Sequence, residues 1–468
     1  MERRIIIVSD LHLGGEPPSD SHAGFQMCTK RGRASLAGLI RWIQDQRSPD
    51  RDVLLVLAGD VVDFLAEQPF AAFTADDDLA ADKLRQAMFH SDEVWTALRL
   101  YLEAGGALSI LLGNHDPELS LPSPRRLLLD RLGQGRIEFI DDNRALTIGP
   151  VLIEHGNRYD SWNRVHHDDL RQVRSALSRR EQPPPFSPVP GSVLVTDVMN
   201  PLKPHYPFID LLKPENEAVL PLLAVLEPKT IKSLGLLWKV LQEHRRRGKG
   251  HPDGQPVDRG YISASGEQDA RTDQAMFDMA RELAGAADPG SIGFSDLWDP
   301  LKVYLDAQHI ANATSRAQAL TRLHRALRAR AKVLHSTFSV TQEKQEYLDA
   351  AKALTRRGFR VVVMGHTHLV KRVPLEAGAV YLNTGTWADL MCFPDELFLQ
   401  DHPDAAAELE RFATDLALGK SDAWRRHVPS FAQIDMGSGD ALTADVYLFR
   451  GPAAIERAPA VSLREMWT

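Results

Sequence analysis

The chain has 468 residues, of which 43% are hydrophobic and 25% charged, so its composition fits a soluble globular protein and excludes disordered or fibrous classes. The formal net charge of −8 provides no general attraction to nucleic acid or to an anionic membrane. The two cysteines, Cys28 and Cys392, exclude a disulfide framework and a thiol-rich metal cluster, and they favour a reducing compartment.

The N-terminal part of the chain alternates short apolar runs with longer helical patterns. This rhythm predicts a layered α/β domain with buried strands. The first run is too short for the core of a signal peptide, and we therefore expect a cytoplasmic protein. Helices are expected at Arg33–Gln46 and Asp82–Ala104. The strands are expected at Arg4–Val8, Val53–Leu57, Ala107–Leu112, Ile137–Ile140 and Val151–Glu154.

A different pattern, with long helical stretches and proline-rich breaks, follows at 161–358. It predicts a mainly helical insertion that acts as a cap or lid, with helices at Ala307–Leu334 and Thr341–Arg357. The apolar stretch Phe208–Leu226 fits either a lid over an apolar substrate group or packing within the insertion, and it leaves peripheral membrane contact open. The basic run His244–Lys249 fits a solvated surface better than a nucleic-acid or lipid contact.

The α/β rhythm resumes after the insertion. Strands are expected at Phe359–Met364, Val380–Leu382 and Leu442–Phe449. The sequence therefore predicts one catalytic domain formed by residues 1–160 and 359–468, interrupted by the insertion at 161–358.

Five short polar motifs occur in order along the chain, and four of them directly follow an apolar run. Taken alone, each motif is explained at least as well by an ordinary turn or loop as by a functional site. Ligand sites of α/β proteins form outside the carboxyl ends of parallel strands, so these motifs are expected to converge. The motifs are Asp10-Leu11-His12, Gly59-Asp60-Val61-Val62-Asp63, Gly113-Asn114-His115-Asp116, His155-Gly156 and Gly365-His366-Thr367-His368.

The order and spacing of these motifs resemble the calcineurin-like metallophosphoesterases over roughly residues 1–160 and 359–390. The resemblance implies a four-layer αββα sandwich of two mixed sheets. It also implies two divalent metal ions, for which we expect Mn²⁺, with Fe, Zn or Mg as alternatives. Hydrolysis of phosphate monoesters or diesters by a metal-activated hydroxide is the implied activity.

The resemblance also implies roles for individual residues. One metal would be held by Asp10, His12 and His368, and the other by Asn114, His155 and His366. Asp60 would bridge both metals. His115 would serve as general acid or as a clamp on the phosphoryl group, and Asp63 would orient its imidazole.

The substrate is less well specified by the sequence. Ser9–Leu13 and Glu154–Asp160 resemble the UDP-diacylglucosamine pyrophosphohydrolases, but those enzymes carry Arg in place of His115 and are about half as long. Hydrolysis of a nucleotide-lipid pyrophosphate is therefore an alternative, and a metal-stabilised scaffold that binds a protein partner is another. Expected substrates are phosphorylated small molecules, nucleotides or nucleic acids. Arg158 is a candidate phosphate contact, and the oligomeric state stays open.

Overall fold

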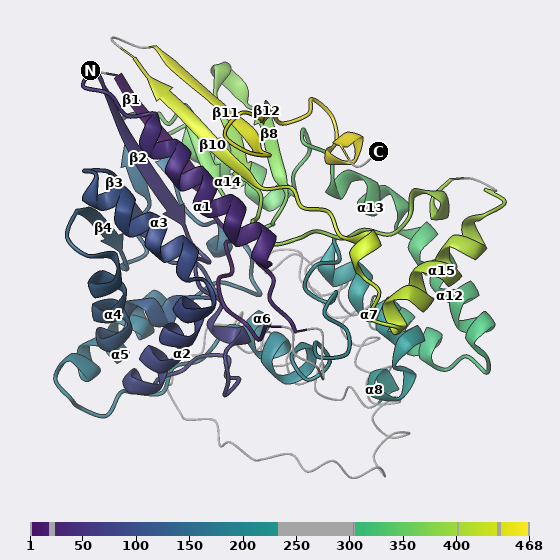
Figure 1. Cartoon of the computed structure of the whole chain (residues 1–468). Coiled ribbons are helices and arrows are strands. Elements are labelled where there is room, and N and C mark those ends of the chain that lie inside the picture. Colours follow the sequence, from purple (N-terminus) through teal and green to yellow (C-terminus); the bar gives the residue numbers. More distant parts are fainter. Residues whose placement is uncertain are drawn as a thin grey trace. The chain divides into compact units, whose positions relative to one another are not determined.

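The apolar runs of the N-terminal part form four parallel strands on one side of a seven-stranded sheet in the computed structural model of the chain (Figure 1). Strands β10, β11 and β12 extend this sheet antiparallel on the β1 side. The strand order is β12 (Ile455–Arg457), β11 (Leu442–Phe449), β10 (Ser430–Met436), β1 (Glu2–Val8), β2 (Arg51–Ala58), β3 (Ala107–Leu111) and β4 (Arg136–Ile140). The structure describes residues 2–17, 24–232, 303, 305–399, 402–437 and 441–466, and the basic run His244–Lys249 lies outside them.

A second sheet has five strands and is also mixed. Its centre is parallel, with β6 beside β7 and β7 beside β9, while β5 and β8 pair antiparallel at the edges. The strand order is β5 (Leu146–Ile148), β6 (Val151–Ile153), β7 (Val361–Met364), β9 (Val380–Thr384) and β8 (Val370–Pro374).

Helices cover the outer face of each sheet. Alternate residues of the first sheet point to opposite sides: Ile6 and Leu55 pack against helices, whereas Ile5 packs against the second sheet. On the far side of the second sheet, Ala351 of α14 (Gln345–Thr355) packs with Val362. The predicted αββα fold is therefore confirmed. The helices over the first sheet are α1 (Lys30–Asp45), α2 (Asp77–His90), α3 (Asp92–Glu103) and α4 (Pro122–Leu132).

The expected helix at Asp82–Ala104 is wrong, because α2 and α3 are separate helices divided at Ser91. The backbone of Ser91 leaves the helical region, with φ −129° and ψ 30°. Its hydroxyl donates to Ala87 O at 2.5 Å and accepts a hydrogen bond from Trp95 Nε1 at 2.9 Å. Serine competes with the helical backbone for hydrogen bonds in this way, and the chain changes direction there.

Contacts within the chain define two units. The first comprises 1–212, 332–392 and 419–468, so it holds both sheets and also parts of the predicted insertion at 161–212 and 332–358. Its other helices are α5 (His167–Ser178), α6 (Pro190–Leu194), the π-helix η4 (Val195–Met199) and α13 (Ala331–Thr337), which begins one residue before the boundary. Its 3-10 helices are η1 (Phe64–Ala66), η2 (Pro117–Ser120), η3 (Asn157–Tyr159), η5 (Glu376–Gly378), η7 (Asp422–Trp424) and η8 (Leu463–Met466).

The second unit comprises 213–331 and 393–418. In its described part α7 packs against α12 and α15, and Val219 and Leu222 of the apolar stretch are buried there. Among the described residues, no helix is both long and apolar enough to span a membrane. The elements of this unit are α7 (Glu215–Leu226), α8 (Pro228–Lys232), α12 (Arg316–Ala329), η6 (Asp395–Leu397) and α15 (Ala405–Ala417).

Candidate metal centre

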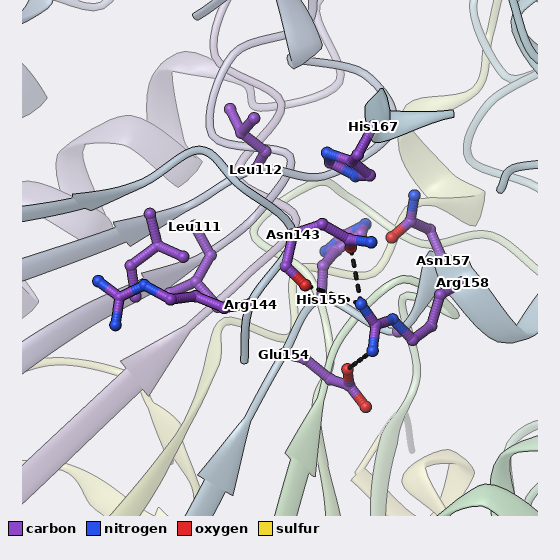
Figure 2. Close-up of a pocket in the computed structure, with 11 residues that line it drawn as sticks. Leu111, Leu112, Asn143, Arg144, Glu154, His155, Asn157, Arg158 and His167 are labelled. Carbon is purple, nitrogen blue, oxygen red and sulfur yellow. Dashed lines mark hydrogen bonds and ion pairs between the residues drawn. The ribbon is translucent and has the colours of Figure 1, made fainter. Parts of the chain in front are cut away.

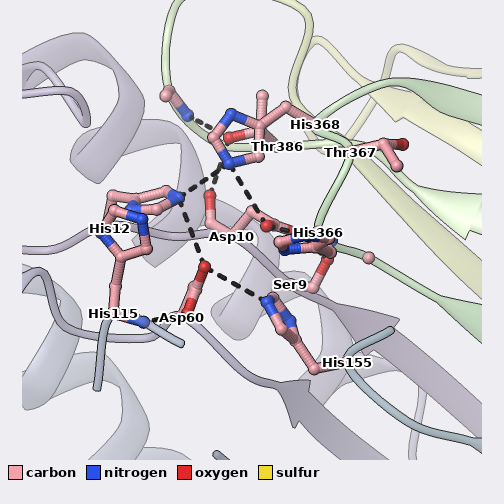
Figure 3. Close-up of polar contacts among 12 residues, drawn as sticks. Ser9, Asp10, His12, Asp60, His115, His155, His366, Thr367, His368 and Thr386 are labelled. Atoms are coloured by element: carbon pink, nitrogen blue, oxygen red, sulfur yellow. Dashed lines mark hydrogen bonds and ion pairs between the residues drawn. The ribbon is translucent and has the colours of Figure 1, made fainter. Parts of the chain in front are cut away.

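All five motifs follow the carboxyl end of a strand, and the structure brings their side chains together (Figure 3). β1 leads to Asp10 and His12, and β2 leads to Asp60. β3 precedes Asn114 and His115 in the first sheet. β6 and β7 of the second sheet deliver the remaining histidines, so the site forms where the ends of both sheets meet.

Asp10, His12 and His368 form one group of potential metal ligands. The Nε2 atoms of the two imidazoles are 2.9 Å apart, and Nε2 of His368 is 3.4 Å from Oδ1 of Asp10. His12 and Asp10 are fully buried. Two imidazole nitrogens and a carboxylate oxygen that converge in a buried place are a typical donor set for a divalent ion.

Asp60 lies between this group and a second one. Its Oδ2 is 3.9 Å from Nε2 of His12 and 3.2 Å from Nε2 of His155. Burial tends to raise the pKa of Asp60, but the neighbouring His155 and His115 hold it well below its usual value. Asp60 is therefore an anion with imidazoles on two sides.

His155 shows that the second group fits a cation. Nδ1 of His155 donates a hydrogen bond to the carbonyl of Ala58 at 2.9 Å, which turns the lone pair of Nε2 toward Asn114 Oδ1, at 3.3 Å, and Asp60. Three acceptors facing one another need a positive charge between them. In the protein alone a proton meets this need: burial opposes it, but Asp60 raises the pKa of His155 to about 9. A divalent ion satisfies the same acceptors.

His366 belongs to the second group and has a partner that the sequence did not indicate. Its backbone N–H donates to both carboxylate oxygens of Asp10, at 2.9 and 3.1 Å. Its Nε2 lies 3.0 Å from Oδ2 of Asp160. Burial acts to raise the pKa of Asp160, but the hydrogen bond and the charge of His366 outweigh it and hold this pKa low. Because an ionised carboxylate can only accept, Nε2 carries the proton and Nδ1 keeps its lone pair for a metal.

We expect Asp160→Ala to weaken metal binding by about 10–100-fold, because the variant loses the carboxylate that sets the tautomer of His366. Calorimetric titration of the metal-free protein with Mn²⁺ would measure this change. The matched control is Asp168→Ala, which removes a carboxylate whose side chain is 95% exposed on the nearby helix α5. Equal affinities of the two variants would contradict the role of Asp160.

Among the imidazoles around Asp60, that of His115 is the most exposed to solvent. Its side chain is 17% exposed, whereas that of His12 is fully buried. Its Nδ1 lies 3.0 Å from Oδ1 of Asp63, and its backbone N–H donates to Oδ1 of Asp60 at 2.8 Å. Burial lowers the pKa of His115, but the carboxylates of Asp63 and Asp60 outweigh it and raise the pKa to about 10.

Asp116 holds the second and third motifs together. Its two carboxylate oxygens accept hydrogen bonds from the backbone N–H groups of Gly113 and Val61, at 2.7 and 2.6 Å. It is fully buried, and burial raises its pKa to about 7. Asp116 therefore links the loops that follow β2 and β3 through these two hydrogen bonds.

The backbone at the site is unusual for residues other than glycine. Left-handed conformations of such residues are uncommon and cost of order 1–3 kcal/mol when the residue is not suited to them. Such strain gathers at functional sites, where the surrounding structure enforces it. Positive φ angles occur at Asp10 (53°), His12 (44°), Asp60 (50°), His366 (70°) and His368 (62°).

The candidate substrate contact Arg158 lines a small pocket beside His155 (Figure 2). Its Nη2 donates to the carbonyl and the side-chain oxygen of Asn143, both at 2.8 Å, and its Nη1 lies 3.4 Å from Oε2 of Glu154. These contacts fix the guanidinium on the wall next to His155. Contact of Arg158 with a substrate stays a prediction.

Comparison with known proteins adds one finding. Residues 3–206 match the model of a family described as calcineurin-like phosphoesterase. The matched region contains Asp10, Asp60, Asn114 and His155, whereas His366 and His368 lie beyond it and join the site through the fold. No curated protein matches the chain.

Proposed function

Residues 3–206 belong to the calcineurin-like phosphoesterase family, and on that premise we propose that the chain is a binuclear metal-dependent hydrolase of phosphate esters. The position of Asp60 carries the proposal. One carboxylate oxygen faces imidazoles from both groups of potential ligands. This is the arrangement needed for one carboxylate to bridge two cations.

The proposed ligands divide into two sets that share Asp60. Bound there, two divalent cations would neutralise charge on the phosphoryl group and activate a water for attack. Imidazole, carboxylate and amide donors suit Mn²⁺, and they also suit Fe or Zn. The first set is Asp10, His12 and His368, and the second is Asn114, His155 and His366.

His115 and Asp63 would together supply a proton to the leaving group. The carboxylate of Asp63 accepts from Nδ1 of His115 and so keeps the imidazole oriented and charged. The partial exposure of His115 allows a substrate to reach the ring. We infer that His115 donates the proton from Nε2 to the departing oxygen, a step that matters most for poor leaving groups.

The test of the proposal is a count of bound metal. The intact protein should bind about two Mn²⁺ ions per chain and hydrolyse bis-p-nitrophenyl phosphate, and a chelator should abolish turnover. Asp60→Asn should lower the occupancy of both ions, since both lose the shared ligand, whereas His12→Ala should chiefly empty one.

Elemental analysis and turnover are to be measured on the same samples. The control is His324→Ala in the second unit, where the imidazole contacts the carbonyl of Leu397, and this variant should keep both ions. A single ion in the intact protein would contradict the binuclear centre. Two ions without hydrolysis of any phosphate ester would favour the scaffold alternative.

A further inference from the structure

Ser9 and Thr384 are two buried hydroxyl residues that meet beside Asp10. Ser9 directly follows β1 of the first sheet, and Thr384 is the last residue of β9 in the second sheet. Oγ of Ser9 and Oγ1 of Thr384 are 2.5 Å apart, and each residue is 1% exposed. The hydroxyl of Ser9, which lies beside Asp10 in Figure 3, also contacts Oδ2 of that residue. Hydrogen bonds between the two sheets thus end on a proposed metal ligand.

The direction of these hydrogen bonds follows from the number of protons. A carboxylate that binds a cation is ionised and can only accept, so the single proton of the Ser9 hydroxyl goes to Asp10. Ser9 then accepts from Thr384, whose hydroxyl is the donor of that pair. We call this chain, from Thr384 through Ser9 to Oδ2 of Asp10, the hydroxyl relay. The carbonyl of Gly385, at 3.5 Å from Oγ of Ser9, is a more distant acceptor for the same proton.

The Oδ2 side of Asp10 is enclosed by the loop after β7. A Cβ atom on Gly365 would lie 2.1 Å from Oγ of Ser9 and 2.5 Å from Oδ2 of Asp10, so the backbone of Gly365 packs directly against this pair. The backbone N–H of His366 donates to Oδ2 at 2.9 Å and, less closely, to Oδ1 at 3.1 Å. Oδ2 is therefore occupied by two donors.

The other carboxylate oxygen of Asp10 faces the proposed metal ligands. Oδ1 lies 3.4 Å from Nε2 of His368, and Asp10, His12 and His368 form one group of potential ligands. A carboxylate can bind a cation through one oxygen or through both. Hydrogen bonds to a ligating carboxylate orient it, so donors on Oδ2 favour binding through Oδ1.

We propose that Ser9 and Thr384 are positioning residues, which leave only Oδ1 of Asp10 free to bind a metal ion. The relay thereby sets the affinity of the ion held with His12 and His368, and not that of the second ion. This proposal rests on the proposed binuclear centre. Ser430 of β10 fixes the start of the relay, since its buried hydroxyl donates to the carbonyl of Thr384 at 2.6 Å.

The test is a calorimetric titration of the metal-free full chain with Mn²⁺. Ser9→Ala removes the hydrogen bond to Asp10 and should raise the Kd of one ion by about 10–100-fold, while the Kd of the other changes by less than about threefold. The weakened ion should be the one that His12→Ala empties, so adding Ser9→Ala to His12→Ala should leave the remaining ion nearly unaffected. The matched control is Ser109→Ala, which removes another buried serine of the first sheet, in β3.

Thr384→Val separates the relay from packing, because valine has nearly the shape of threonine but no hydroxyl. Without this donor the proton of Ser9 can turn to the carbonyl of Gly385, so the same ion should bind more weakly, by a smaller factor than in Ser9→Ala. Thr384→Ser keeps the hydroxyl and should restore the affinity of the unmodified chain. Thermal unfolding of the metal-free variants measures any loss of packing separately.

Three results would overturn the proposal: unchanged Mn²⁺ affinities in Ser9→Ala, an equal loss for both ions, or an equal effect of Thr384→Val and Thr384→Ser. A lower unfolding temperature with normal Mn²⁺ binding would show that the relay only stabilises the packing. Failure of the proposed function is a separate outcome. Two ions and hydrolysis of bis-p-nitrophenyl phosphate in the unmodified chain would leave that function standing, whereas a single ion there would remove the centre on which the relay acts.

Discussion

His115→Ala is expected to slow the hydrolysis of an alkyl phosphate ester by about 10²–10⁴-fold, the usual contribution of a positioned general acid. The same variant should lose much less activity on a dinitrophenyl ester, because a good leaving group departs without a proton. The geometry supports this difference: the imidazole is held by Asp63 at 3.0 Å and is partly exposed at the edge of the site. Rates on the two esters and the metal content of the same samples give the comparison.

Asp63→Asn is the graded control for this experiment. It keeps the shape of the side chain but removes the charge that orients the imidazole, so the alkyl ester should lose about 10–100-fold. Both variants should keep their metal, since neither His115 nor Asp63 is a proposed ligand. Equal losses of His115→Ala on the alkyl and the dinitrophenyl ester would show instead that His115 stabilises charge on the phosphoryl group.

The fold and the convergence of the motifs could be predicted because the central strands are buried on both faces. Such strands are continuous apolar runs, and Ile5–Val8 and Val361–Met364 stand out from the helical patterns around them. The polar residues that follow these runs necessarily lie at the end of a sheet. Strong local patterns therefore predicted a layered α/β domain with motifs that converge at strand ends, whereas the four-layer αββα arrangement was implied by the family resemblance.

The strands that the sequence did not indicate are short or partly exposed. β5 and β12 have three residues each, and Glu456 and Arg457 of β12 are exposed. β8 contains Lys371 and Arg372, and β10 alternates apolar with polar side chains, so neither forms an apolar run. Their pairing depends on neighbours far along the chain, and a local pattern carries little information about it.

The role of Asp160 at the site could not be predicted from the sequence, because it depends on a contact between residues far apart in the chain. Asp160 and His366 are 206 positions apart, and a carboxylate after Arg158-Tyr159 reads locally as a polar turn. Asp160 becomes interpretable only when the fold places the imidazole of His366 next to it.

Gly113→Ala is expected to reduce the activity at least about 100-fold, because it would displace the proposed shared ligand Asp60. A Cβ atom on Gly113 would lie 2.0 Å from Oδ1 of Asp60 and 2.5 Å from its backbone nitrogen. A rotation of the Asp60 side chain cannot relieve the second contact, so the loops after β2 and β3 must separate. Shifts of about 1 Å in a catalytic group are sufficient for a loss of this size.

The same substitution tests whether the close approach of the loops after β2 and β3 is needed for metal binding or only for stable packing. Overpacking alone should cost about 1–3 kcal/mol of stability, which thermal unfolding measures. Loss of metal from a protein that is still folded would show that the approach positions Asp60. Gly38→Ala in α1 is the control, because its Cβ would meet Phe449 at an ordinary 3.5 Å and a helical alanine is favoured over glycine. Gly113→Ala with full metal content and an unchanged rate would be incompatible with a shared role of Asp60, because the carboxylate cannot remain in place beside the added methyl group.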